Sequence, residues 1–123
     1  GHVDDGVNAD KTRDTWIASQ GGRIGFDTFG YETELEDPPF WARPRQQRLD
    51  HFLRFIGSDG YLDRALASAD ANCSPLGWPG VKGHTINYLF TDLIPDLRAA
   101  GIDEATISRI FVDNPAEFLS LSS

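Results

Sequence analysis

Acidic residues stand at three points where a short apolar stretch of the chain gives way to a loop. The three points are Asp70 after the run 65–69, Asp27 after the run 24–26, and the pair Asp4 and Asp5 near the beginning. A carboxylate at the carboxyl end of a buried parallel strand lies where α/β barrels keep their chemistry. Because a helical pattern follows each point, the chain is predicted to contain three successive units of strand end, loop and helix.

Two short strands should position the carboxylates. Residues 23–27 alternate so that Asp27 faces away from the apolar side chains of the run. Residues 65–70 alternate in the same way, with alanines on the face opposite Asp70. In a barrel, the face that carries the carboxylate would point inward.

Helices are predicted around these strands. The first covers residues 8–20, with Asn8 as its cap and a weak apolar face limited to Trp16 and Ile17. The clearest amphipathic helix is 44–57, whose core positions recur at spacings of three and four: Leu49, Phe52, Leu53 and Ile56. His51 falls between those core positions and is expected to be solvated.

The last third of the chain is predicted to be helical. Residues 85–100 form one pattern, which Pro95 should kink or interrupt. Asp103 should cap the next helix, and Asn114 with Pro115 should restart a short terminal one.

Length and composition bound the fold. The chain has 123 residues, of which 40% are hydrophobic, whereas a complete (β/α)8 barrel needs roughly 250 residues. The predicted fold class is therefore α/β, with residues 1–123 forming a single segment of about half a barrel. The sequence contains no methionine, so we expect a fragment, a processed product or a chain whose start has been removed.

The net charge limits the kinds of partner that the chain can bind, and the cysteine content indicates its cellular compartment. Nineteen acidic residues against eleven basic ones give a net charge of −8, which disfavours nucleic acid and anionic membrane surfaces as partners. No apolar run approaches the length of a membrane span. The single Cys73 fits a reducing compartment, so we expect a cytoplasmic location.

Four motifs together resemble the C-terminal part of the phosphotriesterase family, which belongs to the amidohydrolase superfamily of binuclear-metal barrels. They are Gly1-His2-Val3-Asp4-Asp5, Arg23-Ile24-Gly25-Phe26-Asp27, Ala67-Ser68-Ala69-Asp70 and the segment from Phe111 to Leu119. They occur in the order and spacing of the family and cover essentially the whole chain. The resemblance implies the end of strand 6, strands 7 and 8 of a (β/α)8 TIM barrel, and the helices that follow.

The resemblance also implies site residues and a cofactor. His2 would be the metal ligand at the end of strand 6, and Asp70 would be the ligand at the end of strand 8. Imidazole and carboxylate suit zinc, manganese or cobalt, so the complete barrel would hold two divalent transition-metal ions, most simply zinc. A metal-bound hydroxide would attack an ester, lactone or phosphoester, Asp70 would take its proton, and Asp5 would occupy the position of a proton relay.

Substrate contacts are expected from Asp27, Thr28, Tyr31 and Trp78 at the mouth of the barrel. The long loops 28–43 and 71–84 should set specificity. Thr28 stands where the organophosphate-degrading members carry histidine and the lactonases carry arginine. The run Phe26 to Gly30 instead resembles the phosphotriesterase homology proteins, which leaves ester or lactone hydrolysis open.

Part of the site of the family is absent from this chain. The His-x-His pair of strand 1, the carbamylated lysine of strand 4 and the histidine of strand 5 have no counterpart here. Because zinc sites usually need three protein ligands, we expect the isolated chain to be inactive. The missing N-terminal half-barrel or a second copy would then be its partner. The alternative is a non-catalytic half-barrel that serves as an interaction or assembly module.

Each candidate residue also has a simpler explanation. Gly1-His2 could be the remnant of a cloning tag, and Asp70 could only cap the turn that begins at Ala71. Asp27 could accept backbone hydrogen bonds. The aromatic side chains of Tyr31 and Trp78 could cover the core beneath their loops.

Overall fold

The computed structural model describes residues 3, 9–30, 43–69 and 87–120 of the chain. Its first part contains helix α1 (Lys11–Ser19), strand β1 (Ile24–Phe26), helix α2 (Arg45–Ile56), the 3-10 turn η1 (Leu62–Arg64) and strand β2 (Ala65–Ala67). Its second part contains the wide helical turn η3 (Leu89–Leu93), α3 (Ile94–Ala99), α4 (Glu104–Ser108), the wide turn η4 (Arg109–Asp113) and α5 (Asn114–Leu119). The described residues therefore form a mixed α/β structure, as the sequence predicted.

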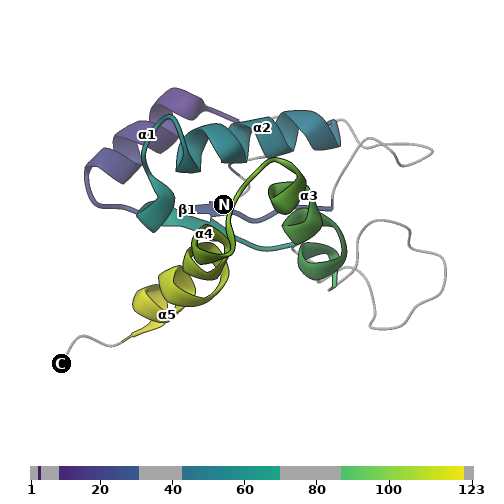
Figure 1. Cartoon of the computed structure of the whole chain (residues 1–123). Helices are drawn as coiled ribbons and strands as arrows, with labels where there is room; N and C mark the ends of the chain where they lie inside the picture. Colours follow the sequence, from purple (N-terminus) through teal and green to yellow (C-terminus); the bar gives the residue numbers. More distant parts are fainter. Residues whose placement is uncertain (1–2, 4–8, 31–42, 70–86, 121–123) are drawn as a thin grey trace.

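Strands β1 and β2 form a parallel two-stranded sheet. Its register pairs Ile24 with Ala65, Gly25 with Leu66, and Phe26 with Ala67. The pairing continues past both strands, because Ser68 donates its N–H to the carbonyl of Phe26 at 2.9 Å and Phe29 donates to the carbonyl of Ser68 at 3.2 Å. Figure 1 shows α1 and α2 above the strands in this view and α4 and α5 below them.

The aromatic core lies between the sheet and α2. Phe26 is fully buried, and its ring lies 5.0 Å from the ring of Phe52 and 5.3 Å from that of Phe55. Burying one such ring stabilises a fold by about 1.5–3 kcal/mol. Ile24 is buried on the same face, whereas Gly25 is half-buried, so the predicted alternation of β1 is confirmed.

Helix α1 starts later than predicted. Asp10 is its N-cap and accepts a hydrogen bond from the N–H of Arg13 at 2.9 Å, which makes the helix begin at Lys11. The expected cap, Asn8, lies outside the described residues. Of the two residues expected on its apolar face, Ile17 packs against the core as predicted, but Trp16 is 65% exposed. The buried side chains of α1 are Asp14 and Ala18, which lie four residues apart on the face toward α2.

Helix α2 confirms the predicted amphipathic pattern, with one correction. Leu49, Phe52 and Ile56 are buried as expected, and Leu53 is half-buried. His51 is only 2% exposed, so the expectation that it is solvated is wrong. The face of α2 that carries His51 packs against α1, and the centroid of the His51 ring lies 5.2 Å from that of the Phe26 ring.

The C-terminal segments confirm two predicted breaks and explain them. Pro95 lies in the first turn of α3, directly after the wide turn η3, and Pro115 lies in the first turn of α5, directly after η4. A proline inside a regular helix lacks an N–H and clashes with the carbonyl four residues earlier, so a locally widened turn accommodates it. Asp103 caps α4 as predicted, accepting from the N–H of Thr106 at 2.8 Å.

No helix among the described residues combines the length and the apolar character that crossing a membrane would require.

Asn114 ties the C-terminal helices to the sheet. Its side chain is fully buried, and its amide nitrogen donates to the carbonyls of Leu62 and Ala65, both at 2.8 Å. These carbonyls belong to η1 and to the first residue of β2. One side chain therefore satisfies two acceptors where the chain enters the second strand.

Replacing Asn114 with alanine should destabilise the fold by about 2–4 kcal/mol, because two buried carbonyls lose their donor. Asn114→Asp should cost more at neutral pH, since a carboxylate would face two carbonyl oxygens. Urea unfolding measures both effects, with Ser120→Ala at an exposed hydrogen bond as the control. If Asn114→Ala costs no more than the control, this anchoring role is refuted.

Candidate active site

The carboxyl ends of β1 and β2 are the part of the sheet where chemistry was predicted. Asp27 follows β1 directly and is half-buried, on the side of the strand opposite Ile24 and Phe26. The parallel register puts Asp27 level with Ser68, two residues before Asp70. The structure therefore brings the two predicted strand ends together at one edge.

The other predicted site residues fall in parts of the chain that the structure does not describe. They are His2, Asp5, Tyr31, Asp70 and Trp78. Their assignments as metal ligands, proton carriers and substrate contacts stay predictions.

Thr28 lies next to Asp27 and is held from the α2 side. It is 3% exposed, and both its carbonyl oxygen and its Oγ1 accept a hydrogen bond from Nη1 of Arg48. Arg48 itself is fully buried. Arg48 was not among the predicted site residues, although its spacing to Phe52 and Phe55 places it on the apolar stripe of the helix, where an arginine is unusual.

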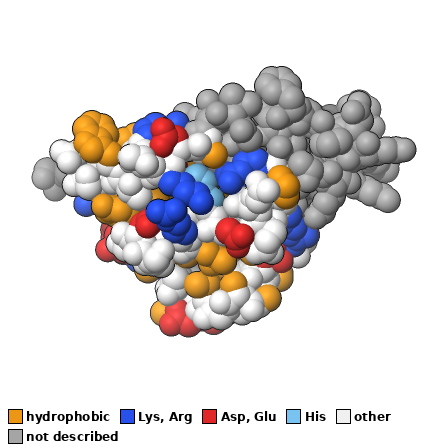
Figure 2. Space-filling model, turned by 90° about the horizontal axis from the view of Figure 1, so that it is seen from above, with side chains coloured by type: hydrophobic (Ala, Val, Ile, Leu, Met, Phe, Trp, Pro, Cys, Tyr) orange, Lys and Arg blue, Asp and Glu red, His pale blue; other side chains and the backbone are white. Residues whose placement is uncertain are grey.

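A second buried polar cluster joins α1 to α2. The carboxylate Oδ2 of Asp14 lies 3.3 Å from Nε2 of His51, and Arg13 binds the other oxygen of Asp14 at 2.7 Å. Nη1 of Arg43 lies 3.2 Å from Nδ1 of His51. Figure 2 shows basic side chains around the histidine on this face. This cluster was not predicted from the sequence. The one indication of it was that Asp14 lies four residues before Ala18, on the same face of α1.

The contacts of His51 determine its charge. A guanidinium can only donate, so Nδ1 must accept from Arg43, and the single proton of the ring stands on Nε2 toward Asp14. Burial, followed by the nearby charges of Arg43, Lys11, Arg13 and Arg54, lowers the pKa of His51 from its usual 6.5 to about 4. The ring is therefore neutral at pH 7 and packs as part of the core.

This shift makes stability depend on pH. A pKa that is lower in the folded state means that the unfolded chain binds the proton more readily, so stability is complete above pH 6.5 and is lost as the pH falls toward 4. His51 should contribute about 3 kcal/mol to this loss, at about 1.36 kcal/mol for each pKa unit.

The comparison of the chain with its His51→Gln variant isolates this contribution from the titration of carboxylates. Urea unfolding at pH 7 and at pH 4 should show a smaller loss of stability in the variant. Equal losses in the two proteins would contradict a buried neutral histidine.

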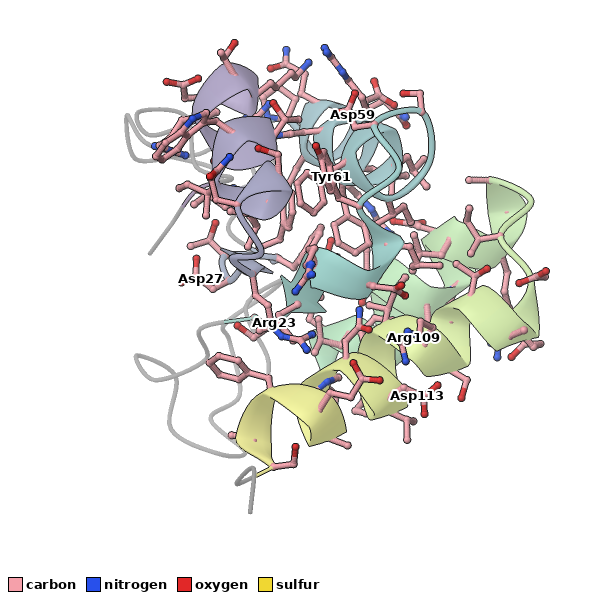
Figure 3. All side chains as sticks on the ribbon, turned by 90° about the vertical axis from the view of Figure 1, so that its left-hand side faces the viewer. Arg23, Asp27, Asp59, Tyr61, Arg109 and Asp113 are labelled. Atoms are coloured by element: carbon pink, nitrogen blue, oxygen red, sulfur yellow. The ribbon has the colours of Figure 1, made fainter. Side chains whose placement is uncertain are left out.

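Ion pairs lie at the amino ends of β1 and β2, opposite the predicted site. Arg109 binds Asp63 at 2.8 Å and Glu117 at 2.7 Å, and Arg23 reaches Glu117 at 3.4 Å beside helix α5 (Figure 3). Arg23 and Asp63 precede β1 and β2, so these charges connect the amino ends of the strands with the C-terminal helices. The two arginines are partly buried and the two carboxylates are more exposed, and all four are mutually paired, which is the pattern of structural ion pairs.

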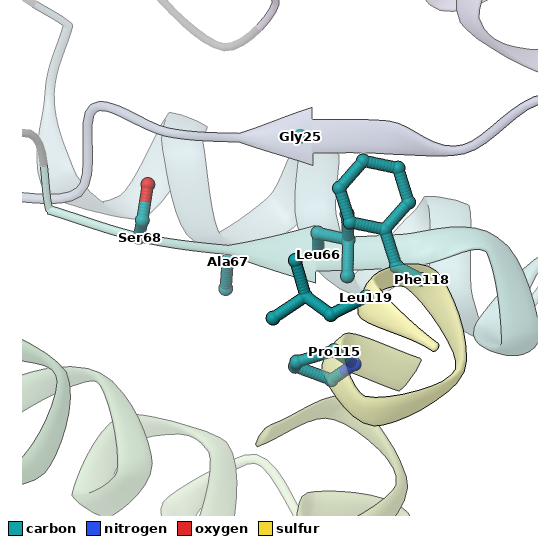
Figure 4. A pocket seen from close by; sticks show the side chains of 7 residues that line it. All are labelled: Gly25, Leu66, Ala67, Ser68, Pro115, Phe118 and Leu119. Atoms are coloured by element: carbon teal, nitrogen blue, oxygen red, sulfur yellow. The ribbon is translucent and has the colours of Figure 1, made fainter. Parts of the chain in front are cut away.

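An apolar cavity of about 280 Å³ lies against the sheet. It is lined by Gly25, Leu66, Ala67, Ser68, Pro115, Phe118 and Leu119. Figure 4 shows Phe118 and Leu119 of α5 beside Leu66 of β2. Since no lining side chain is ionisable, this cavity offers packing surface rather than catalytic groups.

The predicted metal ligands can be compared with the ligands that metal ions prefer in proteins. Within the described ranges, no group of three His, Cys, Asp or Glu side chains could hold a metal ion. The two predicted ligands, one imidazole and one carboxylate, match zinc, manganese or cobalt in kind. Two ligands are nevertheless fewer than the three protein ligands of a catalytic zinc site.

Comparison with known proteins identifies the relatives of this chain. The model of the phosphotriesterase family matches residues 1–119. Aryldialkylphosphatase of Saccharolobus solfataricus is 33% identical across 98% of this chain and 37% of its own length. N-acetyltaurine hydrolase of Bos taurus is 26% identical across 97% of this chain and 34% of its own length.

The same relationship holds in three dimensions. Organophosphorus hydrolase from Deinococcus radiodurans superposes with a TM-score of 0.75 and 28% identity, across 98% of this chain and 36% of that chain. The chain therefore belongs to the phosphotriesterase family, as the four motifs indicated. It spans about a third of the length of the relatives it matches.

Proposed function

We propose that this chain is the C-terminal part of a metal-dependent hydrolase, with β1 and β2 as strands 7 and 8 of a (β/α)8 barrel. The observation that carries the proposal is the parallel pair, whose carboxyl ends bring Asp27 beside the segment that leads to Asp70. The family match over residues 1–119 and the coverage of about a third of each relative support it.

In this proposal, the chain supplies part of a metal site at the mouth of the barrel. His2 and Asp70 would hold two divalent transition-metal ions, of which zinc is the simplest choice, together with ligands from the rest of the barrel. Bound metal ions would acidify a water molecule so that it attacks at neutral pH. Asp70 would accept the proton of that water, and Asp5 would pass it toward solvent.

The proposed substrates are small esters, lactones or phosphoesters. Asp27, Thr28, Tyr31 and Trp78 would contact them. The names of the relatives support this range, since one is an aryldialkylphosphatase, and they add an N-acyl amide to the compounds worth testing, since another is an N-acetyltaurine hydrolase. A cytoplasmic location stays a prediction.

The alternative is a non-catalytic assembly module. The apolar cavity against the sheet and the exposed Phe118 and Leu119, 58% and 75% exposed, would suit packing against another half-barrel. The hydrolase also needs this packing. The two proposals differ in whether the companion segment carries the His-x-His pair and the lysine.

Native mass spectrometry of the purified protein, followed by hydrolysis assays, tests the proposal. We expect an assembly that holds two transition-metal ions and a polypeptide with the remaining ligands, and we expect the 123-residue chain alone to be inactive. Asp70→Asn should lower kcat by about 100-fold or more, since it removes both a ligand and the proton acceptor. Asp113→Asn is the matched control, since Asp113 is exposed and is the last residue of η4.

An assembly in which this chain is joined by a polypeptide with the remaining ligands, but which binds no metal and hydrolyses none of the substrates, would contradict the hydrolase and favour the assembly module. Turnover by the isolated chain with added zinc would refute the claim that its ligand set is incomplete.

A further inference from the structure

The turn that follows β1 is held from two directions. On the sheet side, Phe29 donates its N–H to the carbonyl of Ser68 at 3.2 Å. On the helix side, Arg48 of α2 donates to the carbonyl and to the hydroxyl of Thr28. Residues 27–29 are therefore fastened both to the neighbouring strand end and to the helix behind it.

The contact between Arg48 and Thr28 is closed off from solvent, and the Phe29 donor on the sheet side is also buried, although its acceptor residue Ser68 is exposed. Arg48 is 0% exposed, Thr28 is 3% exposed and Phe29 is 2% exposed. The ring of Phe29 packs edge-on against that of Phe52, with 5.4 Å between the centroids. In this environment water cannot replace a lost donor, so the conformation of the turn depends on Arg48.

The chemistry of the guanidinium explains why an arginine stands there. Burying a charge is costly, and a neutral donor would satisfy a single carbonyl at lower cost. A planar guanidinium aims its donors in fixed directions. Because Nη1 meets two acceptors of the same residue, it fixes the backbone and the side-chain rotamer of Thr28 together.

Asp27 is held indirectly by this arrangement. The peptide before it belongs to β1, whose last residue Phe26 is paired with β2 and accepts from Ser68 at 2.9 Å. The residue after it is Thr28. With both neighbours fixed, the direction of the Cα–Cβ bond of Asp27 at the strand end is fixed as well, and this limits where its carboxylate can lie.

We propose that Arg48 is a positioning residue of the strand-end site. From the buried side of α2, it holds residues 27–29 so that Asp27 keeps one place at the mouth of the barrel, and it thereby sets which substrates the site prefers. This inference rests on the proposed function. A rival explanation gives Arg48 a role in stability alone.

The ratio of kcat/KM for two substrates separates these explanations, because the ratio does not depend on the fraction of protein that is folded. The assay uses the purified, metal-containing protein with an aryl ester and a phosphotriester. Arg48→Met should lower kcat/KM for the preferred substrate about 10–100-fold and change the ratio about threefold or more. Arg48→Lys should not restore the ratio, because a lysine lacks the fixed planar donors.

Two further variants keep the test usable if Arg48→Met folds poorly. Thr28→Val keeps the shape of the side chain but removes the hydroxyl that accepts from Arg48, so it should change the ratio. Arg54→Met on the same helix is the control, since Arg54 is half-exposed and pairs only loosely with Asp59 at 3.3 Å. A ratio that is unchanged in Arg48→Met and in Thr28→Val overturns the specificity role.

Hydrogen exchange gives a readout that needs no activity. In Arg48→Met, the N–H of Phe29 should exchange about tenfold faster or more relative to the N–H of Ile107, which donates to the carbonyl of Asp103 in α4. An unchanged exchange ratio overturns the claim that Arg48 holds the turn. If the parent protein hydrolyses none of the substrates, the proposed function and the specificity claim fail together, and the exchange ratio alone decides whether Arg48 holds the turn.

Discussion

The parallel pairing of β1 and β2 is the constraint on which the rest of the structure depends. Three residues of each strand, from Ile24 with Ala65 to Phe26 with Ala67, define a register that continues into the following turns. Because both strands run in the same direction, everything that follows them meets at one edge. That edge receives Asp27 and the segment leading to Asp70, while the ion pairs of Arg23 and Arg109 stay at the opposite ends.

Buried polar side chains fasten the helices to this short sheet at defined points. Arg48 joins α2 to the turn after β1, and Asn114 joins α5 to the entry of β2. Asp14 and His51 join α1 to α2. Apolar packing around Phe26 supplies the driving force, and it tolerates small shifts. The polar contacts are directional, and a buried polar group would lose its partner if a helix moved. These contacts therefore set the orientation of the site residues.

Much of this arrangement could be predicted from the sequence, because it follows from the spacing of apolar residues in strands and helices and from the residues that cap or break helices. The two strands, the apolar face of α2, the Asp103 cap and the helix breaks at Pro95 and Pro115 all come from short-range rules. The family was predicted from four motifs and is confirmed.

The failures concern residues whose environment depends on a partner far away in sequence. His51 looked like a solvated residue because its partners Asp14 and Phe26 come from other elements, and Arg48 was missed because its acceptor Thr28 lies twenty residues earlier. The most direct test of the account is anomalous X-ray diffraction from crystals of the zinc-loaded protein. We predict zinc peaks at about 2.0–2.2 Å from an imidazole nitrogen of His2 and a carboxylate oxygen of Asp70, at the strand edge that holds Asp27. Zinc bound only elsewhere, or no zinc beside these two residues, would contradict it.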